Sequence, residues 1–78
     1  MKRQSRADRF NDAQGLITEG KNIIEELREE LQNWLDNMPE NLQGGSKADE
    51  LQTAIDELES VIMSLEEVEG VSVDFPGR

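Results

Sequence analysis

The sequence predicts an all-α fold, a two-helix antiparallel hairpin with an extended C-terminal tail that oligomerises into a helical bundle. Two stretches repeat apolar residues at alternating three- and four-residue steps, which is the spacing of one face of a helix. Between them, Pro39 and the glycines at 44–45 mark a short connection, which makes the two helices antiparallel neighbours. The 78 residues are expected to form one domain, with a helix over 5–37, a loop over 38–45, a helix over 46–69 and a tail over 70–78.

The first apolar pattern runs from Phe10 to Met38 without a slip. Its positions correspond to a and d of a heptad repeat. Three further apolar residues, Leu16, Ile23 and Leu35, make the stripe wider than a two-stranded seam needs. The a and d positions are occupied by Phe10, Ala13, Ile17, Gly20, Ile24, Leu27, Leu31, Trp34 and Met38.

Both ends of this helix carry sequence signals. Ser5, followed three residues later by Asp8, predicts a capping box at the start. Pro39 stops the helix because it has no amide proton to donate and disfavours a helical conformation at the preceding residue. Gly20 lowers helix stability by about 1 kcal/mol relative to alanine. It either weakens this part of the helix or lets another backbone approach closely.

The second helix begins at Ser46, which with Asp49 repeats the pattern of the first cap, and Gly70 is expected to end it as a C-terminal glycine. Its seam consists of Ala48, Leu51, Ile55, Leu58, Ile62 and Leu65, widened by Ala54, Val61 and Val68. In the loop, Leu42 is expected to turn inward and cap the end of the bundle beside Trp34.

The tail over 71–75 alternates apolar and polar residues. We expect it to pack on the hairpin, with Phe75 against Phe10, because an unpacked tail would leave its apolar face in water. The alternatives are addition to a sheet edge of a partner and disorder. With the loop as the pivot, Glu69 is expected to lie near Gly15.

The charge is high and uneven, with 18 acidic against 8 basic residues and a net charge of −10. Arg6 and Arg9 lie in a basic N-terminal segment. The last turns of the second helix carry Glu66, Glu67 and Glu69, where the helix dipole disfavours anions. The arginines either neutralise this acidic helix end or form an anion or nucleotide site. Because so acidic a surface repels polyanions, direct binding to nucleic acid or membrane is not expected.

The chain is short and contains no cysteine and no histidine. Disulfides and histidine-bound metals therefore cannot support its small core, and a homo-oligomer is the expected support. The residues expected in the core or at the oligomer interface are Phe10, Ile17, Ile24, Leu27, Leu31, Trp34, Leu51, Ile55, Leu58, Ile62 and Leu65. No run of about 18 apolar residues and no signal-peptide pattern is present, so we expect a cytoplasmic protein.

No group of catalytic residues is recognisable. The serines have no neighbouring histidine to act as a base. Carboxylates lie one turn apart, as in Glu25 with Glu29, but they are off the seam and lack the histidines of di-metal bundles. The glycines at 44–45 lack the rest of a phosphate-binding loop. We predict a protein that is not an enzyme and holds no cofactor and no metal.

The segment Trp34–Gln43 (WLDNMPENLQ), followed by a small-residue turn and by LQTAID at 51–56, resembles small acidic helical proteins encoded by tailed phages and prophages. The resemblance covers about residues 29–59 and carries no catalytic motif and no functional residue. It implies a setting in which short, acidic, non-enzymatic proteins bind host or defence proteins.

Three hypotheses for the function follow. The first is an interaction protein, namely a phage-encoded inhibitor of a host or defence complex. In one version its acidic surface occupies a basic nucleic-acid channel. The second is an oligomeric sponge for a nucleotide signal, since the N-terminal arginines suit phosphate groups. The third is a structural or assembly component of a virion. The candidate ligand- or partner-binding residues are Arg3, Arg6, Arg9, Glu25, Glu26, Glu29, Glu30, Glu66 and Glu67.

Overall fold

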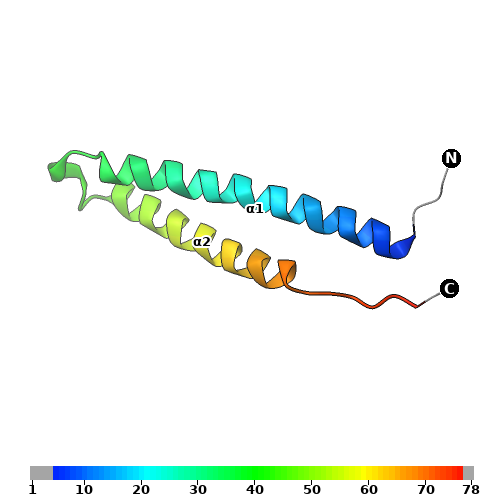
Figure 1. Cartoon of the computed structure of the whole chain (residues 1–78). Coiled ribbons are helices and arrows are strands. Elements are labelled where there is room, and N and C mark those ends of the chain that lie inside the picture. The colour runs from blue at the N-terminus through cyan, green and yellow to red at the C-terminus, as the bar shows by residue number, and fades with distance from the viewer. Residues whose placement is uncertain (1–4, 77–78) are drawn as a thin grey trace.

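The chain folds as the predicted antiparallel helical hairpin (Figure 1). The structure is a computed structural model and describes residues 5–76. Helix α1 spans Arg6–Asp36, the short 3-10 helix η1 spans Glu40–Leu42, and helix α2 spans Ser46–Glu69. The two long helices lie side by side, and the tail continues beyond the end of α2 alongside the first turns of α1.

Residues 5–76 form a single layer of two helices, with extents of 63 × 23 × 14 Å. The radius of gyration is 18.6 Å, whereas a compact domain of this length has one of about 12 Å. The chain exposes 6360 Å², whereas a compact monomer of its mass exposes about 4,800 Å². A lone hairpin therefore leaves far more surface in water than a compact fold of the same size.

The predicted capping box fixes the start of α1. The backbone amide of Asp8 donates to Ser5 Oγ at 3.1 Å, and the amide of Ser5 donates to Asp8 Oδ2 at 3.4 Å. At the other end, the amide of Asn37 donates to the Asn33 carbonyl at 3.0 Å, and the helix stops before Pro39. Both ends of α1 are thus set by local interactions that the sequence predicts.

The ends of α2 differ from the prediction. Ser46 is the first helical residue, and the capping position falls on Gly45, which offers no side chain. The predicted Ser46 cap is therefore wrong, because a residue already inside the helix cannot act as its N-cap. Gly70 does end the helix, but with a φ of −83°. It does not adopt the left-handed conformation that usually favours glycine there.

The core is a narrow line between the helices. Its buried residues all come from α2 and are Ala48, Leu51, Ile55 and Ile62. Helix α1 has no fully buried residue and contributes the half-buried side chains of Phe10, Ile17, Ile24, Leu31, Leu35 and Met38. Ile55, at 2% exposure, is the most completely buried large side chain.

Helix α1 turns its a and e positions, rather than its a and d positions, toward α2. Leu35, at e, is half-buried beside Leu31, while Leu27 and Trp34, at d, remain 45% and 51% exposed. Both d residues are therefore outside the core of the single chain. The other e positions that face α2 are occupied by Gln14, Lys21 and Arg28.

The loop also departs from expectation. Leu42 closes η1 with its side chain 49% exposed, so the predicted inward cap beside Trp34 is wrong. The turn is held by polar interactions instead. Gln43 Nε2 donates to the Met38 carbonyl at 3.1 Å, and the Gly45 amide donates to the Leu42 carbonyl at 3.0 Å. A loop satisfied in this way does not need Leu42 as an anchor.

The tail packs on α1 through Phe75, as predicted, whereas Val71 and Val73 remain 53% and 48% exposed. The rings of Phe10 and Phe75 meet edge to face, with their centroids 5.7 Å apart, which is a favoured aromatic geometry. Gln14 Nε2 donates to the carbonyls of Val68 and Val71, each at 3.2 Å. The tail thereby covers the part of α1 that extends beyond the end of α2.

Candidate functional site

The interface between α1 and α2 has two unlike flanks. On one side a row of polar side chains bridges the helices, and we call it the polar flank. It consists of Gln14, Thr18, Lys21, Glu25 and Arg28 of α1 with Glu59, Glu66 and Glu69 of α2. On the other side lies a row of small and apolar side chains, described below as the apolar band.

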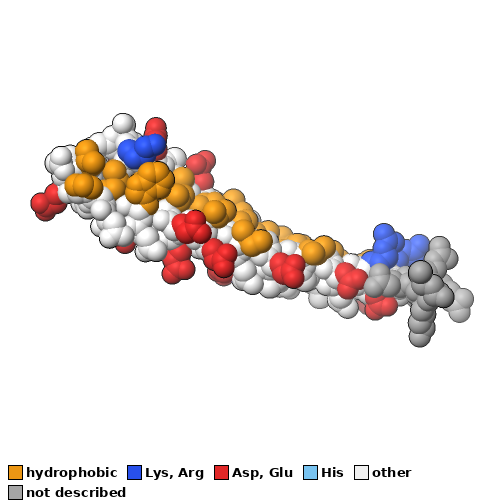
Figure 2. Space-filling view, turned by 90° about the horizontal axis from the view of Figure 1, so that it is seen from above, with side chains coloured by type: hydrophobic (Ala, Val, Ile, Leu, Met, Phe, Trp, Pro, Cys, Tyr) orange, Lys and Arg blue, Asp and Glu red, His pale blue; other side chains and the backbone are white. Residues whose placement is uncertain are grey.

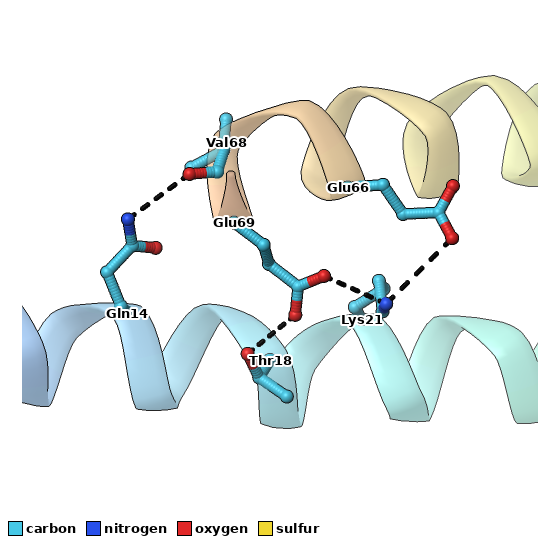
Figure 3. Close-up of polar contacts among 6 residues, drawn as sticks. All are labelled: Gln14, Thr18, Lys21, Glu66, Val68 and Glu69. Atoms are coloured by element: carbon cyan, nitrogen blue, oxygen red, sulfur yellow. Dashed lines mark hydrogen bonds and ion pairs between the residues drawn. The ribbon is translucent and has the colours of Figure 1, made fainter. Parts of the chain in front are cut away.

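The polar flank is centred on Lys21 (Figure 3). Lys21 Nζ lies 2.9 Å from Glu69 Oε1 and 3.9 Å from Glu66 Oε2. Thr18 Oγ1 donates to the second oxygen of Glu69 at 2.6 Å. Both carboxylate oxygens of Glu69 therefore have a partner on α1. About two helical turns nearer the loop, Arg28 Nη1 lies 3.6 Å from Glu59 Oε2.

These contacts change two pKa values. The hydrogen bond from Thr18, followed by that from Lys21, lowers the pKa of the Glu69 carboxyl, and burial opposes the change. The hydrogen bond to Glu69 raises the pKa of the Lys21 ammonium, again against a smaller effect of burial. Each group therefore favours the charged form of the other.

The same contacts correct two predictions. Glu69 lies opposite Thr18 and Lys21, about one turn further along α1 than the expected Gly15. In the part of the chain that the structure describes, the cation that pairs with Glu66 and Glu69 is Lys21. The expected neutralisation by Arg6 and Arg9 is therefore replaced by a lysine in the middle of α1.

The apolar band lies on the opposite flank. It consists of Ala13, Leu16, Gly20, Ile23, Leu27 and Trp34 of α1 with Ala54, Val61 and Val68 of α2. Leu16 is 68% exposed and Ile23 is 57% exposed, although both are large apolar residues. Figure 2 shows hydrophobic side chains following the length of the molecule, with acidic side chains beside them.

Both helices contribute to this band on the same side. Lys47 Nζ lies 5.8 Å from the centre of the Trp34 ring, so Lys47 and Trp34 face the same flank. Residues seven apart share one line along a helix. Val61 and Val68 therefore lie on the line of Lys47, and Leu27 lies on that of Trp34. The band is a two-helix face, and no third element among residues 5–76 packs on it.

The sequence-predicted binding residues do not form one cluster. Arg6 and Arg9 are exposed in the first turns of α1, and Arg3 lies outside the described residues. Glu25 is half-buried on the polar flank. The remaining acidic candidates, Glu26, Glu29, Glu30, Glu66 and Glu67, are exposed. Within residues 5–76 no group of three acidic, cysteine or histidine residues is placed to hold a metal ion.

Two shallow surface depressions accompany these features. One is lined by Leu35, Asp36, Gln43, Ala48, Asp49 and Gln52 near the loop. The other is lined by Glu25, Arg28, Glu59, Ile62 and Met63 on the polar flank. Neither brings a nucleophile and a base together. The apolar band carries the exposed large apolar side chains Leu16, Ile23, Leu27 and Trp34 on one face.

Two functional features escaped the sequence reasoning. The polar residues at Gln14, Lys21 and Arg28 recur every seven positions, and this spacing could have identified an e-position row facing α2. The g-position residues Leu16 and Ile23 were recognised as widening the stripe, but the a/d pattern placed the core on their side of the helix. Their exposure is what separates the band from the core.

No protein-family model, curated protein or solved structure matches this chain. Within the described residues, no helix has the length and apolar character needed to cross a membrane.

Proposed function

We propose that this chain is a non-enzymatic interaction protein that self-associates through the apolar band and presents an acidic exterior to a second protein. The observation that carries the proposal is the exposure of the band, where Leu16, Ile23, Leu27 and Trp34 are between 45% and 68% exposed on one face. Apolar surface gathered on one face and bordered by charged residues is typical of an interaction site.

The exposed area has the size that such a contact requires. The chain exposes 6360 Å², which is about 1,600 Å² more than a compact monomer of its mass. A standard protein–protein interface removes about 800 Å² from each partner. The excess is therefore large enough for one interface of ordinary size, and the apolar band is the part of the surface that gains most from burial.

The exterior favours a basic partner. With a net charge of −10 and exposed carboxylates such as Glu26, Glu29 and Glu67, an assembly of these hairpins attracts basic surfaces and repels nucleic acid. The resemblance to phage-encoded proteins makes host or defence proteins the class to test, with inhibition of a nucleic-acid-binding complex as the expected consequence.

Self-association is tested by sedimentation over a dilution series of the full chain. We expect an oligomer that dissociates on dilution, with the fluorescence of Trp34 shifting to the red as its ring enters water. Ile23→Lys should produce a monomer at every concentration, because a buried ammonium without a partner is costly.

Met63→Lys is the matched control. Met63 is 66% exposed, much like Ile23, but it lies beside Glu25 and Arg28 on the other flank. It should leave the oligomer intact. A wild-type chain that sediments as a monomer throughout, or equal effects of the two substitutions, would refute self-association through the apolar band.

Partner binding is tested with tagged chain in host-cell extract at low and high salt, followed by mass spectrometry. We expect basic proteins to be captured at low salt and released at high salt, since exposed charges are screened over about 3 Å at 1 M. The variant Glu26→Gln with Glu29→Gln should capture less, while its oligomeric state stays unchanged. Binding that ignores both salt and these substitutions would exclude the acidic exterior as the binding surface.

A further inference from the structure

The apolar band also indicates the relative orientation in which two chains meet. This step rests on the proposed self-association and adds its orientation. Two hairpins that join their bands can lie with their loops at the same end, which puts α1 of each over α2 of the other. Alternatively, the loops lie at opposite ends, which puts the two α1 helices against each other and antiparallel.

The length of the band favours the second arrangement. On α1 the band runs from Ala13 to Trp34, but α2 ends at Glu69, which lies opposite Thr18. In the first arrangement a partner's α2 would end close to Leu16, because Gln14 contacts the carbonyls of Val68 and Val71, and only the tail would reach Ala13. Another α1, which spans Arg6–Asp36, covers the whole band with a continuous helix.

The sizes of the side chains point the same way. The N-terminal part of the band contains Ala13 and Gly20, whereas the C-terminal part contains Leu27 and Trp34. When the middle of the band on one α1, at Ile23, meets the middle on the other, small residues face large ones. Alternation of large and small residues across an interface is what close packing requires.

Gly20 strengthens this argument. A Cβ atom built on Gly20 would meet nothing within 4 Å in the chain, so the fold of one hairpin does not require a glycine there. A glycine in the interior of a helix nevertheless lowers helix stability. Gly20 lies in the band, level with a partner's Leu27. Because glycine has no side chain, it leaves room for that leucine.

Charge agrees with this orientation. Arg6 and Arg9 lie in the first turns of α1, while the loop end carries Glu40 in η1. With the two α1 helices centred on Ile23, Arg9 lies level with the partner's Met38, so both arginines come close to the partner's Glu40. Loops at the same end would instead bring the two basic ends together, which is unfavourable.

We infer that two copies of this chain pair through their α1 helices in antiparallel orientation, with the loops at opposite ends and the small residues Ala13 and Gly20 of each copy receiving Leu27 and Trp34 of the other. The partner is a second copy of the chain, related by a two-fold axis near Ile23. Such a contact is self-complementary, as a closed dimer requires.

The orientation is tested with a spin label on the full chain. Asn41→Cys places the label in the exposed loop, and the absence of other cysteines makes the labelling specific. Sedimentation first establishes that the labelled chain is a dimer. We expect a label-to-label distance comparable to the length of α1, about 46 Å. A distance below about half of that length in a dimer overturns the orientation and leaves the proposed self-association standing.

The role of Gly20 is tested by Gly20→Leu against Gly15→Leu. Neither glycine has a neighbour within 4 Å of an added Cβ atom, and Gly15 lies outside the band. Gly20→Leu should weaken dimerisation at least tenfold, while Gly15→Leu should leave the dissociation constant unchanged. Equal dissociation constants for the two variants would overturn the close approach at Gly20, and a chain that never dimerises would overturn the inference together with the proposed self-association.

Discussion

The two flanks of the hairpin differ in whether their side chains find partners within the chain. On the polar flank, Lys21 and Arg28 reach across to carboxylates on α2 and close the interface within one chain. On the band side, Leu27 and Trp34 lie beside the core but remain exposed. The side chains of the polar flank are paired within the chain, whereas the apolar flank gains free energy when another surface covers it.

The largest expected effect is at the core line that separates the flanks. Ile55→Ala should lower the free energy of unfolding by about 2–5 kcal/mol, because it empties the most buried site of the molecule. Ile23→Ala, measured in dilute solution where chains are separate, should cost far less because its side chain already contacts water. Urea denaturation of both variants makes the measurement. Similar losses for the two would mean that the band belongs to the core of the single chain.

A smaller effect is expected from pH on the polar flank. Because the pKa of Glu69 is lowered in the folded chain, its contribution to stability is complete above the ordinary glutamate pKa of about 4.3. It is lost as the pH falls through the lower, folded value. The melting temperature of wild type should therefore drop between neutral and acidic pH by more than that of Glu69→Gln. Glu67→Gln is the control that should follow wild type, because Glu67 is exposed and lies on another face of α2.

The raised pKa of Lys21 acts at the other end of the scale. Its contribution is present below the ordinary lysine pKa of about 10.4 and disappears as the pH rises through the higher, folded value. Neutral pH therefore lies inside the window in which both partners are charged. If the melting temperatures of wild type and Glu69→Gln fell by the same amount between neutral and acidic pH, the ion pair of Lys21 with Glu69 would not stabilise the hairpin.

The smallest expected effect is at Arg28 and Glu59. Their closest atoms are 3.6 Å apart, and their side chains are 33% and 52% exposed. A double-mutant cycle with alanine at both positions should give a coupling energy of about 0–1 kcal/mol, reduced by salt. A coupling well above this range at high salt would mean that the polar flank, and not the core line, holds the helices together.

The sequence predicted the elements that depend on local chemistry. The start of α1 follows from Ser5 and Asp8, its end follows from Pro39, and the antiparallel arrangement follows from the short loop. The contact of Phe75 with Phe10 was also predictable, because the overhang of α1 and the apolar tail need each other. These features depend on neighbours in the chain or on the simple requirement to bury apolar surface.

Only the tertiary structure decided which side of α1 faces α2. The a positions of α1 are flanked by d residues on one side and e residues on the other, and the heptad pattern favoured the apolar d side. In the structure the e side lies inward, with Lys21 within reach of Glu66 and Glu69 of α2. The periodicity of α1 cannot contain that information, because it depends on the register of a second helix. The consequence is an apolar band on the outside, with Leu27 and Trp34 free to meet another molecule.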